Sequence, residues 1–190
     1  ETKWFAAADS SREVYAKEDE INHGCQQVED IMAYAMADKN HFFRQVFGVE
    51  NGENFRHIRR QKHLFDGWKV LFVSRYPRSS DLRDWLISIP NPYIHFGDFD
   101  LAGIHIYQSE FYKYLGDRAS FFVPEDVEER LSRGNARLYD AQYLKYRNMT
   151  LTDMRLNALV QLIHRYKKGY EQEGYIRCVR CDVSDSAPID

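Results

Sequence analysis

The sequence predicts an α/β domain in which a largely parallel four-stranded sheet is flanked by helices. The first observation is that short apolar segments alternate with segments of helical periodicity from residue 41 onward. This order of strand and helix is typical of parallel sheets. The second is that 190 residues, 44% hydrophobic and 29% charged, suffice to bury a core. Three cysteines are too few for a framework of disulfide bonds.

Four segments have the character of strands. The first, at 41–49, is aromatic and β-branched and ends at the turn Glu50-Asn51-Gly52. The second, at 68–74, is a short apolar run typical of a strand buried on both faces. The third and fourth are residues 93–100 and 119–124.

Helices are predicted in the segments between and after these strands. A short helix with a basic face spans 53–65, and Ser79-Ser80-Asp81 caps a helix that runs to about residue 88. The remaining predicted helices cover 101–115, most of 125–146 and most of 152–173.

The chain divides into three parts on this interpretation. Residues 1–40 form a polar arm (1–24) and an amphipathic helix (25–40), which we interpret as a remnant of a preceding domain, since the sequence has no initiator Met. Residues 41–176 form the main domain, and residues 177–190 form a tail.

Composition excludes some classes of function. No apolar run approaches the roughly 18 residues of a membrane span, so we expect no membrane association. No signal peptide opens the sequence, which favours a cytoplasmic protein. The net charge of −3 gives no overall basic footprint for nucleic acid, although a local basic patch can act beside an acidic site.

Acidic residues follow two of the predicted strands. Glu50 follows the first strand, and Asp98 and Asp100 end the third. Ligands of open α/β sheets bind beyond the carboxyl ends of strands, and residues i and i+2 of a strand point to one side. If the two strands are neighbours, three carboxylates converge, and their repulsion favours a bound cation. Oxygen ligands suit Mg²⁺ or Mn²⁺, which could hold a scissile phosphate. The alternative is that this D-x-D is a solvated turn or a helix cap.

Three strings, in order and spacing, resemble a Toprim domain. They are Val49-Glu50-Asn51 with Phe55 five residues after Glu50, VLFVSRYPRS at 70–79, and YIHFGDFDLAGIHI at 93–106. The sequence is most similar to the branch shared by topoisomerase VI A subunits, Spo11 and the nuclease subunit of Wadjet plasmid-defence systems (JetD or MksG). The Gly97-Asp98 start and YEQEGYI at 170–176 resemble the Wadjet nuclease more closely. The resemblance covers about residues 44–176.

The resemblance implies metal-dependent DNA cleavage by a catalytic domain at 41–176. It makes Glu50 a general acid/base or metal ligand, Asp98 and Asp100 ligands of Mg²⁺ or Mn²⁺, and Glu171 and Glu173 supporting acids. It also implies DNA, a second copy of the chain, and subunits of an SMC/condensin-like complex as partners, and association with the nucleoid. The turn Ser74-Arg75-Tyr76-Pro77 lacks the usual glycine of the family.

Two sets of cations are candidates for contacts with the DNA backbone. Arg56, Arg59 and Arg60 share one face at helical spacing. Arg75 and Arg78 lie in the loop after the second strand, on the expected active edge. An ordinary solvated surface is the alternative for both sets.

Cys178 and Cys181 form one C-x-x-C pair, which is weak evidence for zinc. His23 and Cys25 could complete four ligands only from the other end of the sequence.

Three other functions stay open. A topoisomerase VI-type subunit would use an attacking tyrosine from a separate winged-helix domain, and none of the 13 tyrosines stands out as that nucleophile. A non-catalytic module for dimerisation and DNA docking would keep the Toprim shape without its chemistry. A small-molecule phosphate enzyme would need a glycine-rich phosphate loop, which the sequence lacks.

Overall fold

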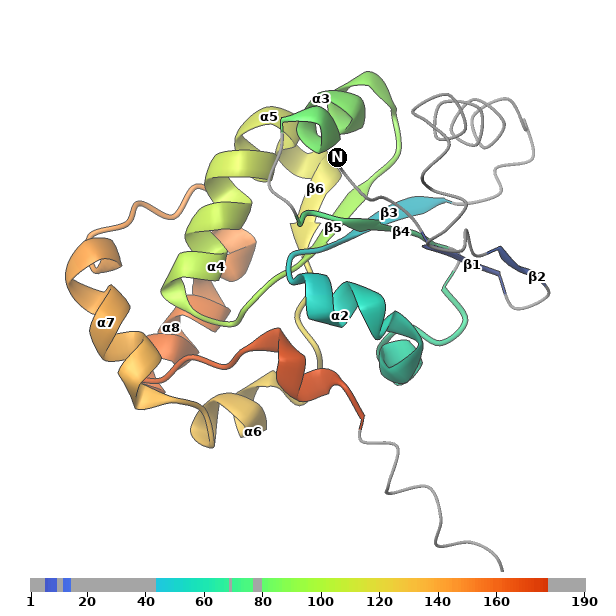
Figure 1. The fold of residues 1–190 in the computed structure, drawn as a ribbon. Coiled ribbons are helices and arrows are strands. Elements are labelled where there is room, and N and C mark those ends of the chain that lie inside the picture. The colour runs from blue at the N-terminus through green and yellow to red at the C-terminus, as the bar shows by residue number, and fades with distance from the viewer. Residues whose placement is uncertain (1–5, 10–11, 15–43, 69, 77–79, 178–190) are drawn as a thin grey trace, which may run out of the picture.

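A computed structural model describes residues 6–9, 12–14, 44–68, 70–76 and 80–177 (Figure 1). The predicted helix at 25–40 and the C-x-x-C pair at positions 178 and 181 lie outside these residues, as does Arg78.

The sheet confirms the predicted fold class. Four parallel strands form its centre in the order β4-β3-β5-β6. They are β3 (Gln45–Val49), β4 (Val70–Ser74), β5 (Tyr93–Phe96) and β6 (Ala119–Phe121). Each of the four strands is shorter than its predicted segment.

Two short strands extend the sheet beyond β4. They are β1 (Ala6–Asp9) and β2 (Arg12–Val14), and β1 pairs antiparallel with both β4 and β2. The sequence analysis expects a loose arm here and predicts neither strand. Their Ala-rich and charged sequences have little strand propensity of their own, so pairing with the open edge of β4 decides their conformation.

Helices cover both faces of the sheet (Figure 1). The α-helices are α2 (Gly52–Arg56), α3 (Asp81–Ser88), α4 (Leu101–Ile106), α5 (Lys113–Leu115), α6 (Val127–Ser132), α7 (Ala136–Tyr146) and α8 (Asn157–Tyr166). The 3-10 helices are η2 (Ile58–Leu64), η4 (Gly116–Arg118), η5 (Met154–Leu156) and η6 (Gln172–Tyr175), and η3 (Tyr107–Tyr112) is a π-helix between α4 and α5. None of the described helices has the length and apolar character needed to cross a membrane.

The single helix predicted at 53–65 is two helices separated at His57. A pair of buried side chains explains the break. Asn54 donates from Nδ2 to Gln61 Oε1 at 2.7 Å, and Gln61 Nε2 donates back to the Asn54 carbonyl at 2.8 Å. That carbonyl is thereby occupied by a side chain.

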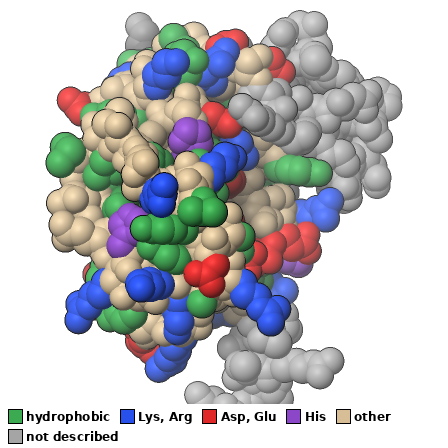
Figure 2. Space-filling model, turned by 90° about the vertical axis from the view of Figure 1, so that its left-hand side faces the viewer, with side chains coloured by type: hydrophobic (Ala, Val, Ile, Leu, Met, Phe, Trp, Pro, Cys, Tyr) green, Lys and Arg blue, Asp and Glu red, His purple; other side chains and the backbone are tan. Residues whose placement is uncertain are grey.

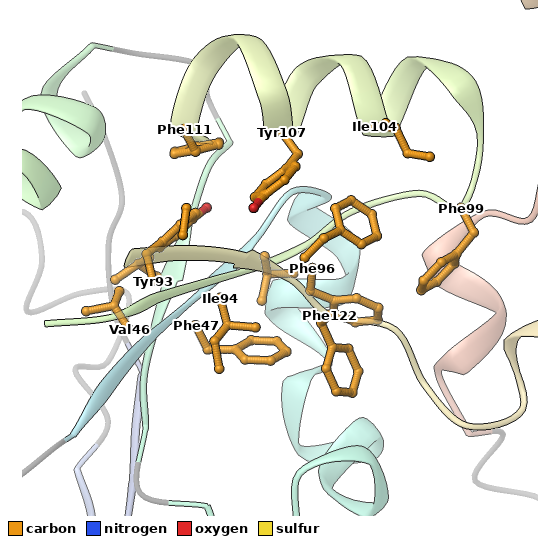
Figure 3. Close-up of a cluster of buried hydrophobic side chains, with 14 of the residues drawn as sticks. Val46, Phe47, Tyr93, Ile94, Phe96, Phe99, Ile104, Tyr107, Phe111 and Phe122 are labelled. Carbon is orange, nitrogen blue, oxygen red and sulfur yellow. The ribbon is translucent and has the colours of Figure 1, made fainter. Parts of the chain in front are cut away.

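Aromatic residues fill the core on both faces of the sheet (Figure 3). On the α2 face, Phe47 is fully buried and packs against Phe72, Phe96 and Phe122, with ring centroids 5.3–5.8 Å apart. On the opposite face, α4 and η3 lie over Tyr93, whose ring is 4.7 Å from that of Phe111. Burial on both faces is typical of a parallel sheet, and it holds the ends of β3 and β5 in a fixed position.

A buried carboxylate, that of Asp153, joins the π-helix η3 to the start of η5. The hydroxyl of Tyr107 donates to the buried carboxylate of Asp153 at 2.7 Å, and Arg155 pairs with the same carboxylate at 2.7 Å.

We expect Tyr107→Phe to lower the free energy of unfolding by about 2 kcal/mol, because one hydrogen bond to a charged acceptor is lost while Arg155 still pairs with Asp153. Urea denaturation would measure this change. Tyr143→Phe is the control, since the Tyr143 side chain is exposed on α7. Equal stability of the Tyr107→Phe variant and the wild type would contradict the expectation.

Candidate functional site

The candidate site lies at the carboxyl edge of β3 and β5, which are adjacent as the prediction requires. Val49 lies opposite Phe96, and the backbone N–H of Glu50 donates to the Phe96 carbonyl at 2.9 Å. Gly97 is needed here, because a Cβ atom at this position would lie 2.5 Å from Glu50 Oε2. The Glu50 carboxylate therefore lies directly against the residue that precedes Asp98.

Asp98 is in a loop rather than at the end of a strand. β5 stops at Phe96, and Phe99 forms an isolated antiparallel bridge with Tyr170. The Asp98 carboxylate accepts a hydrogen bond from the backbone N–H of Gln172 through Oδ1, at 2.8 Å. Within the described part of the chain, Oδ2 accepts none.

The electrostatics of Asp98 show that the carboxylates gather. The pKa of Asp98 is raised from 3.8 to about 7, first by burial and then by the nearby carboxylates of Asp100, Glu50 and Glu171, against the lowering effect of the Gln172 N–H. Glu171, a predicted supporting acid, thus lies near Asp98, because the backbone of the next residue, Gln172, binds the Asp98 carboxylate.

Asp100 has a structural role that the sequence analysis left as an alternative. It is the N-cap of α4, where Oδ1 accepts from the Gly103 N–H at 2.8 Å. Its other oxygen, Oδ2, accepts from Gln142 Nε2 of α7 at 2.7 Å. Both oxygens of this buried carboxylate are therefore engaged, and burial raises its pKa.

The described residues contain no group of three or more His, Cys, Asp or Glu side chains arranged to hold a metal ion. The three-acid centre stays a prediction. Mg²⁺ is commonly bound through only one or two carboxylates together with water and substrate phosphate, and Asp98 with Glu50 offers that smaller set.

The residue whose backbone N–H binds Asp98 also carries a buried side-chain amide without a partner among the described residues. The side chain of Gln172 is fully buried, and neither Nε2 nor Oε1 has a hydrogen-bond partner among the described residues. Buried polar groups normally bind water or an ion when no protein group satisfies them.

The sequence analysis missed the residue that orients Glu50. His95 is fully buried on β5, and its Nε2 lies 3.2 Å from Glu50 Oε2, while Nδ1 lies 3.0 Å from the Tyr93 hydroxyl. An ionised Glu50 carboxylate only accepts, so the contact assigns the imidazole proton to Nε2, and Nδ1 then accepts from the Tyr93 hydroxyl. The signal in the sequence was the i, i+2 spacing of Tyr93 and His95, which puts both on one face of the strand.

Arg75 forms ion pairs inside the protein rather than presenting a free cation to DNA. Its Nε and NH2 groups donate to both oxygens of Glu110, each at 2.9 Å, and NH1 lies 3.7 Å from Glu50 Oε1. Its predicted role in DNA binding gains no support from this arrangement, in which Arg75 offsets the charge of Glu50.

We expect Arg75→Gln to lower the free energy of unfolding by about 2 kcal/mol, because Glu110 and Glu50 lose the cation that neutralises them. Thermal unfolding would measure this. Arg83→Gln is the matched control, since Arg83 pairs with Asp84 at the surface, where such pairs contribute little. Similar losses in the two variants would show that Arg75 acts only as a surface cation.

The other predicted DNA contacts are spread over α2 and η2. Arg56 is exposed and pairs with Glu53 at 3.2 Å, and Arg60 donates from Nε to the Arg177 carbonyl at 2.7 Å. Arg59 is exposed. Their role in DNA binding stays a prediction.

A groove lies between the start of α7 and the segment that carries Glu171 and Glu173. It has a volume of about 830 Å³, and Arg133, Arg137, Glu171 and Glu173 are among its lining residues. Glu173 also accepts a hydrogen bond from the Asn51 side chain at 2.6 Å, which ties the groove to the end of β3. The segment that carries both glutamates pairs with Phe99 through Tyr170, between the two aspartates.

Comparison of the chain with models of protein families, with curated proteins and with solved structures finds no match. The resemblance to Toprim domains stays a prediction.

Proposed function

We propose that this chain cleaves phosphodiester bonds of DNA with a divalent cation, Mg²⁺ or Mn²⁺, held at the carboxyl edge of β3 and β5. The observation that carries the proposal is the meeting of the ends of β3 and β5, where the Glu50 carboxylate lies against Gly97, the residue before Asp98. The pKa of Asp98, raised to about 7 first by burial and then by the neighbouring carboxylates, agrees with this arrangement. Clustered, partly buried carboxylates are unfavourable without a cation, and such clusters mark functional sites more often than structural ones.

The residues present fit the cation through Asp98 and Glu50. Asp98 has one oxygen free of hydrogen bonds from the described residues, and Glu50 is oriented toward Gly97 by His95. When bound, the cation would offset the charge of the scissile phosphate and lower the pKa of a bound water molecule. Glu50 is the base that would accept a proton at Oε1 or Oε2, and Asp100 positions the loop by capping α4.

The groove lined by Arg133 and Arg137 would take the DNA backbone next to the acids. Arg137 is exposed and forms no ion pair with the described residues, so its guanidinium is available for a phosphate. By the resemblance, the partners would be a second copy of the chain and subunits of an SMC/condensin-like plasmid-defence complex, on the nucleoid.

The test is calorimetric titration of Mn²⁺ and Mg²⁺ into the wild type, followed by nicking of supercoiled plasmid. We expect binding of Mn²⁺ that Glu50→Gln weakens, and nicking that EDTA abolishes. Asp66→Asn is the matched control, since Asp66 is exposed before β4, at the opposite edge of the sheet. Absence of both metal binding and nicking, with the fold intact, would contradict the proposal.

A non-catalytic DNA-docking module is the second candidate, and one observation favours it. Both oxygens of Asp100 are occupied by Gly103 and Gln142, as in a carboxylate retained only for capping. In that case the chain would bind DNA with equal affinity with and without divalent cations, and Arg137→Gln would weaken binding while Asp98→Asn would not.

A further inference from the structure

A second groove lies on the outer side of α4 and η3, away from the acids. It has a volume of about 660 Å³, within the range of small-molecule sites. One wall is the α4–η3 helix, and the other is the end of α7 with the loop that follows it. The lining residues are His105, Gln108, Ser109, Tyr112, Lys113, Lys145, Tyr146, Asn148, Met149, Thr150 and Thr152.

The lining of this groove favours an anion. It contains two lysines and a histidine but no Asp or Glu. Lys113 and Lys145 are both exposed, and neither forms an ion pair with the described part of the chain. Figure 2 views the molecule from the side of α7, where Lys, Arg and His side chains lie next to hydrophobic ones.

Aromatic rings give the groove surfaces on which a planar group can stack. The His105 and Tyr146 rings are 5.1 Å apart, and the Lys145 ammonium lies 4.8 Å from the centre of the Tyr146 ring. Tyr112 supplies a ring from η3. Rings beside cations are the arrangement that proteins use to bind a base together with its phosphate.

A buried amide supplies a directional contact. Gln108 is 6% exposed, and its Oε1 accepts from the N–H groups of Thr152 and Asp153 and from the Thr152 hydroxyl, at 2.6–3.2 Å. These three donors all bind Oε1 and so fix the orientation of the amide. The amide nitrogen, Nε2, is on the opposite side and has no acceptor among the described residues. A base with carbonyl or ring-nitrogen acceptors would satisfy this donor.

The π-helix explains why these groups meet. Its wider turn at Tyr107–Tyr112 interrupts a helix that would otherwise continue to Leu115. Single π-turns are rare, and they occur often at functional sites.

We propose that this groove binds a nucleotide through its base and phosphate, either a free nucleotide or an unpaired nucleotide of a DNA strand. The phosphate would lie at Lys113 and Lys145, and the base between Tyr112 and Tyr146 with Gln108 Nε2 at its edge. This proposal is independent of cleavage at the acids.

The test is to titrate nucleotide probes into the full chain in the presence of EDTA. Binding is measured by calorimetry and by the change in the NMR signal of the Gln108 side-chain amide. The probes are dAMP, deoxyadenosine, inorganic phosphate and a single-stranded oligonucleotide of eight deoxyadenosines. We expect dAMP or the oligonucleotide to bind and to shift the Gln108 signal, and deoxyadenosine and phosphate alone to bind more weakly. Tighter binding of dAMP would identify a free nucleotide as the ligand, and tighter binding of the oligonucleotide would identify a strand.

Variants locate the binding. Tyr146→Leu should weaken it by about tenfold through loss of stacking, and Lys145→Gln, at an exposed position, by a smaller factor. The controls are Tyr143→Leu, one turn earlier on α7, and Lys167→Gln, after α8; both should leave affinity unchanged. Asp98→Asn should also bind normally, which separates this site from the acids. The proposal is overturned if no probe binds at millimolar concentration, or if Tyr146→Leu and Lys145→Gln bind as the wild type does.

Discussion

Replacing Asp98 by Asn is expected to slow metal-dependent plasmid nicking by a factor on the order of 100 to 1,000. The reason is that the amide keeps the size of the side chain but loses the charge that holds the cation, whose contribution to the transition state is several kcal/mol. Asp98 has an oxygen free of hydrogen bonds from the described residues, and no ion pair with them offsets its charge, whereas Glu50 lies 3.7 Å from the Arg75 guanidinium; Asp98 therefore has the largest expected effect.

Asp100→Asn provides the informative contrast. Asn caps helices as well as Asp does, so the Gly103 N–H can keep its acceptor and α4 its start. We expect a loss of nicking well below that of Asp98→Asn. The measurement is the initial rate at saturating Mn²⁺, with Asp66→Asn as the control. If Asp98→Asn nicks at the wild-type rate, Asp98 does not hold the metal ion; if both aspartate variants lose activity equally, the three-acid centre predicted from the sequence is the better description.

The sequence was sufficient to predict the central strands and the place where Glu50 and Asp98 meet. The apolar runs that became β3, β4 and β5 are recognisable because a strand buried on both faces has no polar alternation. The carboxyl ends of adjacent parallel strands meet at one edge, so Glu50 and Asp98 had to be close once β3 and β5 were neighbours.

The partners of the site residues could not be predicted in the same way. Gln142 reaches Asp100 across 42 positions of the sequence, and Glu110 reaches Arg75 across 35. Such contacts depend on how helices pack on the sheet, which local periodicity does not specify. The role of His95 was missed, although its contact with Glu50 follows from the register of β3 and β5.

The edge strands show a similar limit. The polar sequence of β1 and β2 has no strand signal, and their conformation depends on the open edge of β4. The helix predicted at 53–65 is interrupted at His57, because the Gln61 side chain binds the Asn54 carbonyl, and the periodicity of the sequence does not reveal this contact.

Asp98→Asn is also expected to raise stability at high pH in the absence of divalent cations. The pKa of Asp98 is raised from 3.8 to about 7, so the folded state holds the proton more tightly than the unfolded state. The stability that this proton contributes is fully present below about pH 4 and is lost as the pH rises to about 7. Above about pH 7 the free energy of unfolding no longer changes through this group. At 1.36 kcal/mol per pH unit, the cost at pH 8 is at most about 4 kcal/mol.

Urea denaturation in EDTA at pH 8 and at pH 5 would measure this. The variant cannot ionise, so at pH 8 it should be more stable than the wild type by up to about 4 kcal/mol, and at pH 5 by clearly less. The exposed control Asp66→Asn should show no such pH dependence. A variant that is less stable at both pH values would show that the hydrogen bond to the Gln172 N–H outweighs the charge repulsion, and that Asp98 is a structural residue.

Mn²⁺ should reduce the difference in stability between the two proteins. A cation that binds only the folded wild type stabilises it by about 2.7 kcal/mol at a hundredfold excess over its Kd, whereas the variant lacks the charge to bind it. The wild type at pH 8 should therefore gain stability on addition of Mn²⁺ while Asp98→Asn does not, since the repulsion that destabilises the metal-free site is the same charge that attracts the ion. Equal stabilisation of both proteins by Mn²⁺ would place the cation elsewhere and leave the acids of β3 and β5 without the role assigned to them.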